Sequence, residues 1–186
     1  MNQTKQCTKC NEVKRVSEFN KDHRNKGSLR SYCRSCQANY NRQYTMSNIG
    51  KAHKALSKAK YNRKLAEKKY GISIKDTLKI YDIAFIQAER ECIYCEQDVP
   101  RGQMTIDHVL TFAQGGTNEF SNLLPACNTC NKRKGSKPVL EFLKESCDEH
   151  VTKQVVFRLA LRQRINYEEM LLKLQAPEQL QEIVSQ

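Results

Sequence analysis

Residues 92–138 read CIYCEQDVPRGQMTIDHVLTFAQGGTNEFSNLLPACNTCNKRKGSKP, and they contain the strongest structural signals of the chain. It has one CxxC pair at its start and another near its end. Between them, a short apolar run at 104–109 predicts a strand, and a second short strand is predicted to begin at Asn122. Cys127 then opens a helix that Gly135 ends. This order predicts a β-hairpin followed by a helix, with the cysteine pairs at the hairpin entrance and at the helix start.

The same cysteine pattern recurs outside this stretch. The chain has 9 cysteines, and eight of them form four CxxC pairs. In a reducing compartment such pairs present thiolates to zinc, and a tetrahedral site takes four of them. We therefore predict two structural zinc ions, one held by Cys7, Cys10, Cys33 and Cys36 and the other by Cys92, Cys95, Cys127 and Cys130. The ninth cysteine, Cys147, is expected to be a small buried apolar residue.

Polar residues capable of chemistry stand at the end of the first strand and on the helix. Asp107 and Asn131 offer two oxygen ligands, which suit Mg²⁺ or Mn²⁺ because these ions keep waters and take further ligands from a phosphate. Strand alternation places His108 on the side opposite Asp107, where a neutral imidazole can accept a proton from an attacking water. Asn122 is predicted to form hydrogen bonds across the loop and to fix the orientation of His108.

Positive charge is concentrated in the N-terminal part of the chain. The net charge is +12, and residues 1–70 carry 18 Lys and Arg against 4 Asp and Glu. Such a stretch attracts a polyanion, most often nucleic acid, although a solvated basic surface explains the charge alone equally well. No apolar run approaches the roughly 20 residues of a membrane span, and the N-terminus lacks the apolar core of a signal peptide. We expect an intracellular, cytoplasmic protein with no membrane partner.

Residues 45–72 are predicted to be a basic helical connector. Ala, Lys and Leu favour a helix, and the apolar stripe is thin, so the helix is expected to pack poorly against protein and to follow a phosphate backbone. A simple spacer helix is the alternative. The residues assigned to DNA contact are Lys54, Lys58, Arg63 and Lys64 in the connector and Lys132, Arg133 and Lys134 after the last cysteine pair.

Helices are also predicted on both sides of the hairpin. Ser73, with Asp76 three residues later, predicts the start of an amphipathic helix over 73–90. Its core-facing residues are predicted to be Ile74, Leu78, Tyr81 and Phe85. Beyond Gly135, helices are predicted from about 136 onward and over 152–165, 167–176 and 178–184. This tail either completes the core or pairs with a second copy in a homodimer, and the sequence does not decide between the two.

The stretch at 92–138 resembles the zinc-stapled branch of the HNH (ββα-metal) endonuclease family. The likeness rests on Asp107-His108, an Asn fourteen residues after the histidine, and CxxCN followed by basic residues. The module around the first two CxxC pairs is similar, more loosely, to one found before such nucleases in phage and mobile-element proteins. The resemblance implies a magnesium- or manganese-dependent hydrolase that cuts double-stranded DNA, one strand per active site, and leaves 5′-phosphate and 3′-hydroxyl ends.

The resemblance also implies a role for each site residue. His108 matches the general base, Asp107 and Asn131 match the ligands of the catalytic metal, and Asn122 matches the residue that positions the loop. Asn131 stands where the family name has its last histidine, which leaves the choice of metal open. The resemblance is compatible with phage, homing and restriction nucleases, and it favours the phage or mobile-element type.

We thus predict a small, mostly helical α+β protein built on a zinc-stapled ββα-metal core. Its parts are predicted as an N-terminal zinc ribbon or knuckle-like module at 1–44, the connector at 45–72, the nuclease core at 73–146 and a helical tail at 147–186. The main alternative is a non-catalytic zinc protein that binds DNA as a regulator. An RNA-binding or RNA-cutting protein is a weaker alternative, because no aromatic stacking platform is evident.

Overall fold

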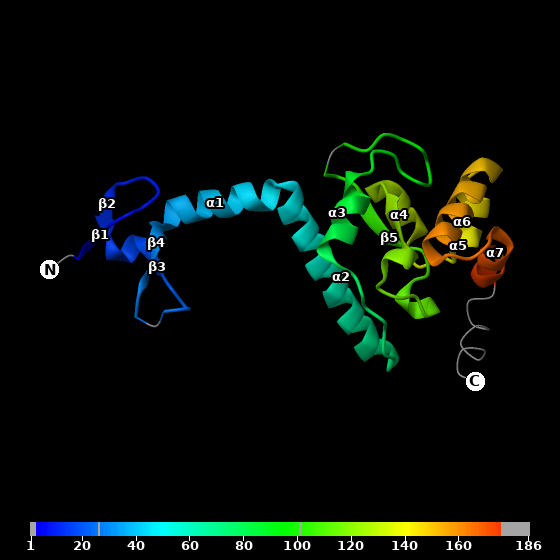
Figure 1. The fold of residues 1–186 in the computed structure, drawn as a ribbon, viewed down its shortest axis with the longest axis horizontal. Helices are drawn as coiled ribbons and strands as arrows, with labels where there is room; N and C mark the ends of the chain where they lie inside the picture. The colour runs from blue at the N-terminus through cyan, green and yellow to red at the C-terminus, as the bar shows by residue number, and fades with distance from the viewer. Residues whose placement is uncertain (1–2, 26, 101, 176–186) are drawn as a thin grey trace. The chain divides into compact units, whose positions relative to one another are not determined.

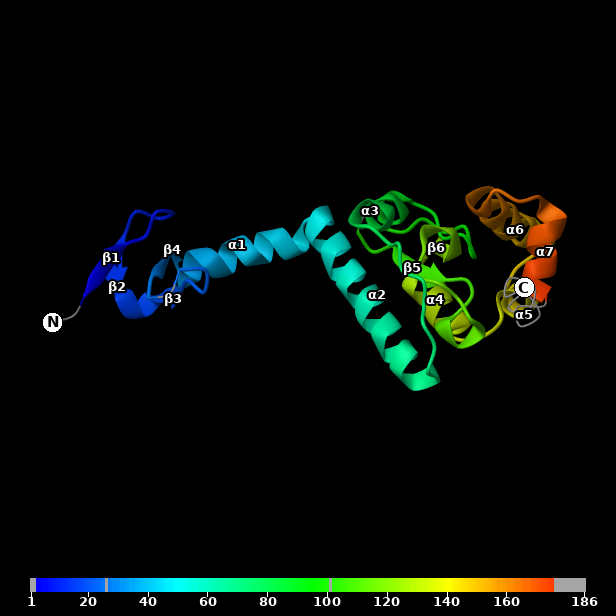
Figure 2. The same cartoon turned by 60° about the horizontal axis from the view of Figure 1, so that its bottom comes forward.

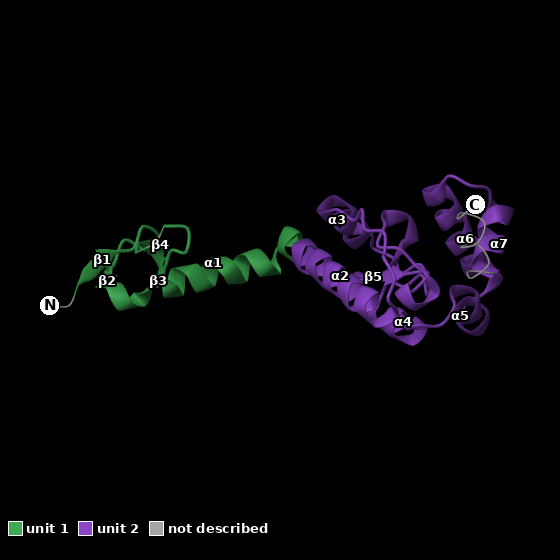
Figure 3. Ribbon diagram, turned by 90° about the horizontal axis from the view of Figure 1, so that it is seen from below, with its two compact units in different colours: residues 1–50 green, residues 51–186 purple. Residues whose placement is uncertain are grey.

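A computed structural model describes residues 3–25, 27–100 and 102–175. The chain forms two compact units, Met1–Gly50 and Lys51–Gln186, each with its own fold (Figure 3). Within the described residues, no helix is both long and apolar enough to cross a lipid bilayer.

The first unit is built from two small hairpins and a helix (Figure 1). Its elements are β1 (Thr4–Gln6), β2 (Val13–Arg15), the 3-10 turn η1 (Val16–Glu18), β3 (Phe19–Lys21), β4 (Leu29–Cys33) and α1 (Arg34–Met46). Its buried apolar core consists of Phe19 and two of the cysteines, Cys7 and Cys33. A core of this size is smaller than an isolated fold usually requires, and small modules of this kind are commonly stabilised by a bound metal. Helix α1 begins directly after Cys33.

The basic connector is a long helix, α2 (Asn48–Tyr70), as predicted. The expectation that it packs poorly is wrong. Its Ala52 is fully buried in a cluster that contains Ile83, Ile86 and Leu123. Three partly buried residues of the helix also pack on this cluster: Ala55, Leu56 and Ala59. Alanine contributes little to an apolar stripe in the sequence, yet the alanines of α2 take part in this cluster. The stripe is therefore a better packing surface than its hydrophobicity suggests.

The helix predicted over 73–90 is shorter than expected. It forms α3 (Ile80–Ala88), and the Asp82 carboxylate caps it by accepting a 2.8 Å hydrogen bond from the Lys79 backbone N–H. The predicted start at Ser73 is therefore wrong. Tyr81 and Phe85 are also not core residues, since they are 68% and 60% exposed. The predicted stripe counted helical spacing through residues that are not helical, which shifted the buried face; the residues that α3 buries are Ile83 and Ile86.

The hairpin and helix predicted from residues 92–138 are present. Strands β5 (Thr105–His108) and β6 (Leu123–Ala126) pair antiparallel, with Asp107 opposite Leu124 and His108 opposite Leu123. The loop between them contains the short 3-10 turns η2 (Phe112–Gln114) and η3 (Phe120–Asn122). Helix α4 (Asn128–Lys134) follows β6 and lies against β5 (Figure 2). Cys127 caps its start and Gly135, with a φ of 52°, its end.

The C-terminal helices complete the core of the second unit. They are α5 (Val139–Ser146), α6 (Glu149–Gln163) and α7 (Tyr167–Gln175). Their buried side chains, such as Phe142 and Leu159, share one cluster with the zinc-binding segment and the hairpin. The predicted start of α6 at Thr152 is wrong, because Asp148 caps it by accepting a bond from the Val151 backbone N–H. The helix predicted over 178–184 lies outside the described residues.

Candidate active site and zinc centres

The four CxxC pairs come together two by two, as predicted. Cys7, Cys10, Cys33 and Cys36 form one cluster, and Cys92, Cys95, Cys127 and Cys130 form another. Within each cluster the sulfur atoms all lie within 4.8 Å of one another. Four thiolates in this arrangement match the donor set of a tetrahedral structural zinc site. Each cluster can therefore hold one zinc ion.

Both clusters are built on the same type of turn. The fourth residue after the first cysteine has a positive φ in each, 59° at Asn11 and 54° at Glu96. The backbone N–H of each of these residues donates to the carbonyl of that cysteine, Cys7 or Cys92, at 2.9 and 2.8 Å. The second turn is attached to the hairpin by a bond from the Ile93 N–H to the Pro125 carbonyl at 3.1 Å. A zinc ion bound by the second cluster would thus hold the turn at 92–95, the end of β6 and the start of α4 together.

Buried polar side chains mark one place in the second unit. Among the described residues, those that are polar or charged and buried are Asp107, Asn118, Asn122 and Lys134, between 0% and 6% exposed. All four lie on β5, on α4 or in the loop of the hairpin. Burying such groups costs free energy unless each is hydrogen-bonded. Their partners therefore define the site.

The Asp107 carboxylate is bonded at both oxygens. Oδ2 accepts a 2.5 Å hydrogen bond from the Tyr94 hydroxyl, and Oδ1 accepts one from the Lys134 ammonium at 3.1 Å. Lys134 also donates to the His108 carbonyl at 2.8 Å. Burial raises the pKa of Asp107, against the lowering effect of Lys134 and the Tyr94 hydroxyl. Burial also holds the pKa of Tyr94 well above its ordinary value, so its hydroxyl stays a donor.

The amide of Asn131 is held in one orientation. Its Nδ2 donates to the Thr105 hydroxyl at 3.0 Å and to the Ile106 carbonyl at 3.1 Å, so α4 is tied to β5. These two bonds use both amide hydrogens and thereby fix which atom is Oδ1. An amide oxygen is a ligand that magnesium and calcium accept.

The His108 ring is held by its Nε2 atom. This atom lies 3.0 Å from Oδ1 of Asn118, and the ring makes an edge contact with Phe112 at a centroid distance of 4.8 Å. Burial lowers the pKa of His108, and the bond to Asn118 opposes this effect. A lowered pKa favours the neutral imidazole near pH 7, the form that can accept a proton.

Asn122 clamps the loop of the hairpin. Its Oδ1 accepts from the Leu110 N–H, and its Nδ2 donates to the carbonyls of Leu110 and Thr117, all at 2.9 Å. The direct contact with His108 comes from Asn118, which the sequence did not single out. Asn118 closely follows Gly115 and Gly116, so it has the pattern of an ordinary turn residue. Tyr94 occupies one of the two variable positions of a CxxC pair. Neither carries a signal that sequence patterns alone reveal.

Comparison with known proteins identifies a family that part of the chain resembles. Residues 92–147 match a family described as HNH endonuclease. This stretch, called the HNH segment below, is therefore similar to HNH endonucleases. The chain is also 34% identical, over 63 residues, to the CRISPR-associated endonuclease Cas9 of Corynebacterium diphtheriae. That likeness covers 33% of this chain and 6% of the length of that relative. Both findings support a nuclease function.

The basic residues assigned to DNA contact fall into two groups. Lys54, Lys58 and Lys64 on α2 are exposed, as are Lys132 and Arg133 in the HNH segment. Two assignments need correction. The Lys134 side chain is 0% exposed, because it serves as the partner of the buried Asp107. Arg63 is engaged by the carboxylates of Glu67 and Asp76, at 2.6 and 3.1 Å, because the segment after α2 folds back over it.

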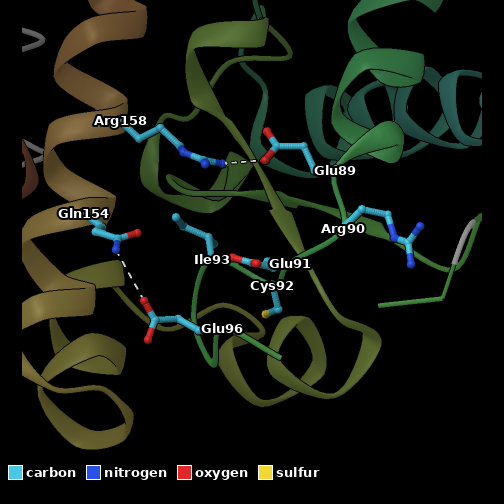
Figure 4. Close-up of a pocket in the computed structure, with 8 residues that line it drawn as sticks. All are labelled: Glu89, Arg90, Glu91, Cys92, Ile93, Glu96, Gln154 and Arg158. Carbon is cyan, nitrogen blue, oxygen red and sulfur yellow. Dashed lines mark hydrogen bonds and ion pairs between the residues drawn. The ribbon is translucent and has the colours of Figure 1, made fainter. Parts of the chain in front are cut away.

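A pocket of about 180 Å³ lies beside the start of the HNH segment (Figure 4). Its walls are Glu89, Arg90, Glu91, Cys92, Ile93, Glu96, Gln154 and Arg158. Several of these side chains pair with one another, as Arg158 does with Glu89 at 2.9 Å and Gln154 with Glu96 at 3.3 Å. The pocket contains none of the residues around Asp107 and His108, so it is not the candidate active site.

Proposed function

We propose that this protein is an endonuclease that uses a divalent metal to hydrolyse phosphodiester bonds in double-stranded DNA. The observation that carries the proposal is the pair Asp107-His108 at the end of β5, inside an HNH segment. One member is a buried carboxylate held at both oxygens, and the other is a partly buried imidazole held at one nitrogen.

Asp107 and Asn131 fit a divalent ion with hard ligands. A carboxylate and an amide oxygen are ligands for Mg²⁺ or Mn²⁺, and two protein ligands leave room for water and a phosphate. When bound, the ion stabilises the charge on the phosphoryl group and on the leaving oxygen. The Tyr94 hydroxyl and the Lys134 ammonium hold the Asp107 carboxylate in place for this role.

His108 acts as the general base in this proposal. The acceptor Oδ1 of Asn118 faces Nε2, so the neutral ring carries its hydrogen there and keeps a lone pair on Nδ1. Nδ1 then accepts a proton from the water that attacks the phosphorus. The attack releases a 3′-hydroxyl and leaves a 5′-phosphate, as the family resemblance implies.

The exposed lysines of α2, together with Lys132 and Arg133, contact DNA phosphates in this proposal. Such contacts give affinity and orientation without choosing a sequence. The N-terminal zinc module adds positive charge and is a candidate for sequence choice. One active site cuts one strand, so a double-strand break requires either a second copy or a second visit. A phage or mobile-element setting is the one we favour, with structural zinc in both cysteine clusters.

The test is relaxation of a supercoiled plasmid by the zinc-loaded protein in Mg²⁺, in Mn²⁺ and in neither. We expect metal-dependent nicks that DNA ligase reseals, since ligase needs a 5′-phosphate beside a 3′-hydroxyl. Tight DNA binding without cutting, in either metal and on several DNAs, would contradict the proposal and favour a DNA-binding regulator. Binding to duplex RNA in preference to DNA would favour the RNA alternative.

A further inference from the structure

A line of polar contacts runs from the His108 ring to helix α2. Oδ1 of Asn118 lies 3.0 Å from His108 Nε2, and Nδ2 of the same amide donates to Asp76 Oδ1 at 2.9 Å. The other carboxylate oxygen of Asp76 pairs with Nε of Arg63 at 3.1 Å. The line joins the loop of the hairpin, the segment before α3 and the basic helix.

The Asp76 carboxylate sets the direction of the two hydrogen bonds in this line. Asp76 forms an ion pair with Arg63, and a carboxylate only accepts hydrogen bonds. Asn118 must therefore turn its NH₂ group towards Asp76, which leaves its carbonyl oxygen facing His108. An oxygen in that position accepts a hydrogen from Nε2 and disfavours the tautomer that carries the hydrogen on Nδ1.

The backbone keeps the amide in place. The Asn118 N–H donates to the Lys75 carbonyl at 2.8 Å, and Asp76 and Asn118 form an isolated bridge between their backbones. The segment before α3 is fixed in turn, because the Ile74 N–H donates to the Glu67 carboxylate at 3.0 Å. Asn118 is fully buried, so water does not compete for its amide.

We propose that Asn118 and Asp76 are positioning residues that hold His108 in the Nε2–H tautomer, with Nδ1 as the atom that accepts the proton. This inference rests on the proposed nuclease function for its catalytic consequence only. The role differs from that of Asn122, whose bonds go to the backbone of the loop. Helix α2 thus supports the active site through Arg63, besides offering its exposed lysines to DNA.

The test reads the tautomer directly. The full-length, zinc-loaded protein is labelled with ¹⁵N at histidine, and two-bond ¹H–¹⁵N correlation spectra are recorded at a pH where His108 is neutral. The chain has 4 histidines, so His108→Ala assigns the signal. The variant Asp76→Ala removes the acceptor that orients Asn118 while it keeps Asn118 itself. Lys75→Ala is the matched control, because Lys75 is the adjacent residue and its exposed side chain pairs only with Glu119 among the described contacts.

In the wild type and in Lys75→Ala we expect the hydrogen on Nε2. In Asp76→Ala we expect both tautomers, together with a fall in kcat of about 10- to 100-fold at unchanged KM for DNA, as is typical when a supporting hydrogen bond is lost. If the wild-type His108 ring carries its hydrogen on Nδ1, the proposal is overturned. This result needs neither a variant nor an activity measurement. A change of tautomer without a change of kcat, or the reverse, also overturns it.

A second variant guards against misfolding of Asp76→Ala. Asn118→Leu keeps a side chain of similar length and removes the acceptor for Nε2–H, so the same loss of tautomer preference and the same fall in kcat are expected. An inactive wild type with an Nε2–H ring would refute the nuclease proposal but leave the positioning contact standing. Failure of the nuclease proposal and failure of the positioning proposal therefore give different results.

Discussion

The Tyr94 hydroxyl donates a 2.5 Å hydrogen bond to Oδ2 of Asp107 and so connects the second zinc cluster to β5. Tyr94 stands between Cys92 and Cys95, and its ring packs edge-on against Phe142 at a centroid distance of 5.1 Å. The residue is buried, so the position of its hydroxyl depends on how the cysteine turn sits in the core. Tyr94 therefore links the cysteine turn of the second cluster to Asp107, the candidate metal ligand.

Replacing Tyr94 tests this connection. In Tyr94→Phe the ring still packs, but Asp107 Oδ2 loses its donor in a buried position. We expect the free energy of unfolding to fall by about 1 to 3 kcal/mol and more Mg²⁺ to be needed for half-maximal cutting. Urea unfolding and a metal titration of plasmid nicking measure the two effects. Tyr81→Phe, at an exposed position, is the control, and equal behaviour of the two variants would contradict the connection.

The ion pair between Lys134 and Asp107 is buried at both ends, with side chains 0% and 3% exposed. Lys134→Met removes the cation and leaves the carboxylate without its charge partner, so we expect a loss of about 3 to 5 kcal/mol in the free energy of unfolding. The control Lys132→Met changes an exposed neighbour on the same helix and is expected to weaken DNA binding with little effect on stability. Equal unfolding midpoints for the two variants would show that the pair contributes nothing.

Arg63 and Lys64 are neighbours on α2, and we expect the first to contribute to stability and the second to DNA binding. Lys64 is exposed, so Lys64→Ala should weaken DNA binding and reduce the slope of log Kd against log salt by about one. Arg63 is held by Glu67 and Asp76, so Arg63→Ala should instead cost roughly 1 to 3 kcal/mol of stability. Salt-dependent binding and urea unfolding of both variants check this. A larger binding defect in Arg63→Ala would reverse the assignment.

The two zinc clusters are expected to support different parts of the chain. Cys36→Ser should lower the bound zinc from two ions to one and weaken DNA binding while the second unit stays folded. Cys95→Ser should unfold the second unit, because its cluster holds the start of the HNH segment, β6 and α4 together. Zinc content, near-ultraviolet circular dichroism and plasmid nicking distinguish these outcomes. Full nicking activity in Cys95→Ser would contradict the role of the second cluster.

The sequence predicts those parts of the structure that depend on local spacing. CxxC turns, a strand that ends in Asp107-His108 and a helix that Gly135 stops each follow from a few adjacent residues. The pairing of the cysteine turns also follows, since zinc needs four ligands. The start of α3 is predicted wrongly, because Ser73 and Asp76 have the spacing of a cap although tertiary contacts engage Asp76 with Arg63 and Asn118.

The contacts that organise the site could not be predicted from spacing. The hydroxyl of Tyr94, the amide of Asn118 and the ammonium of Lys134 reach their partners across 13, 10 and 27 residues of sequence. Each depends on how separate elements pack, which periodicity does not encode. Lys134 illustrates the point, since it stands among exposed cations of one helix and is itself buried.

The measurement that tests the account most directly compares the wild type with His108→Ala under single-turnover conditions. Nicking of supercoiled plasmid in Mg²⁺ or Mn²⁺ is timed while DNA binding is measured on the same preparations. Loss of a general base is expected to slow the cutting step by about 10²- to 10⁴-fold at unchanged Kd. Equal nicking rates for the two proteins would contradict the assignment of His108 and, with it, the proposed chemistry of this site.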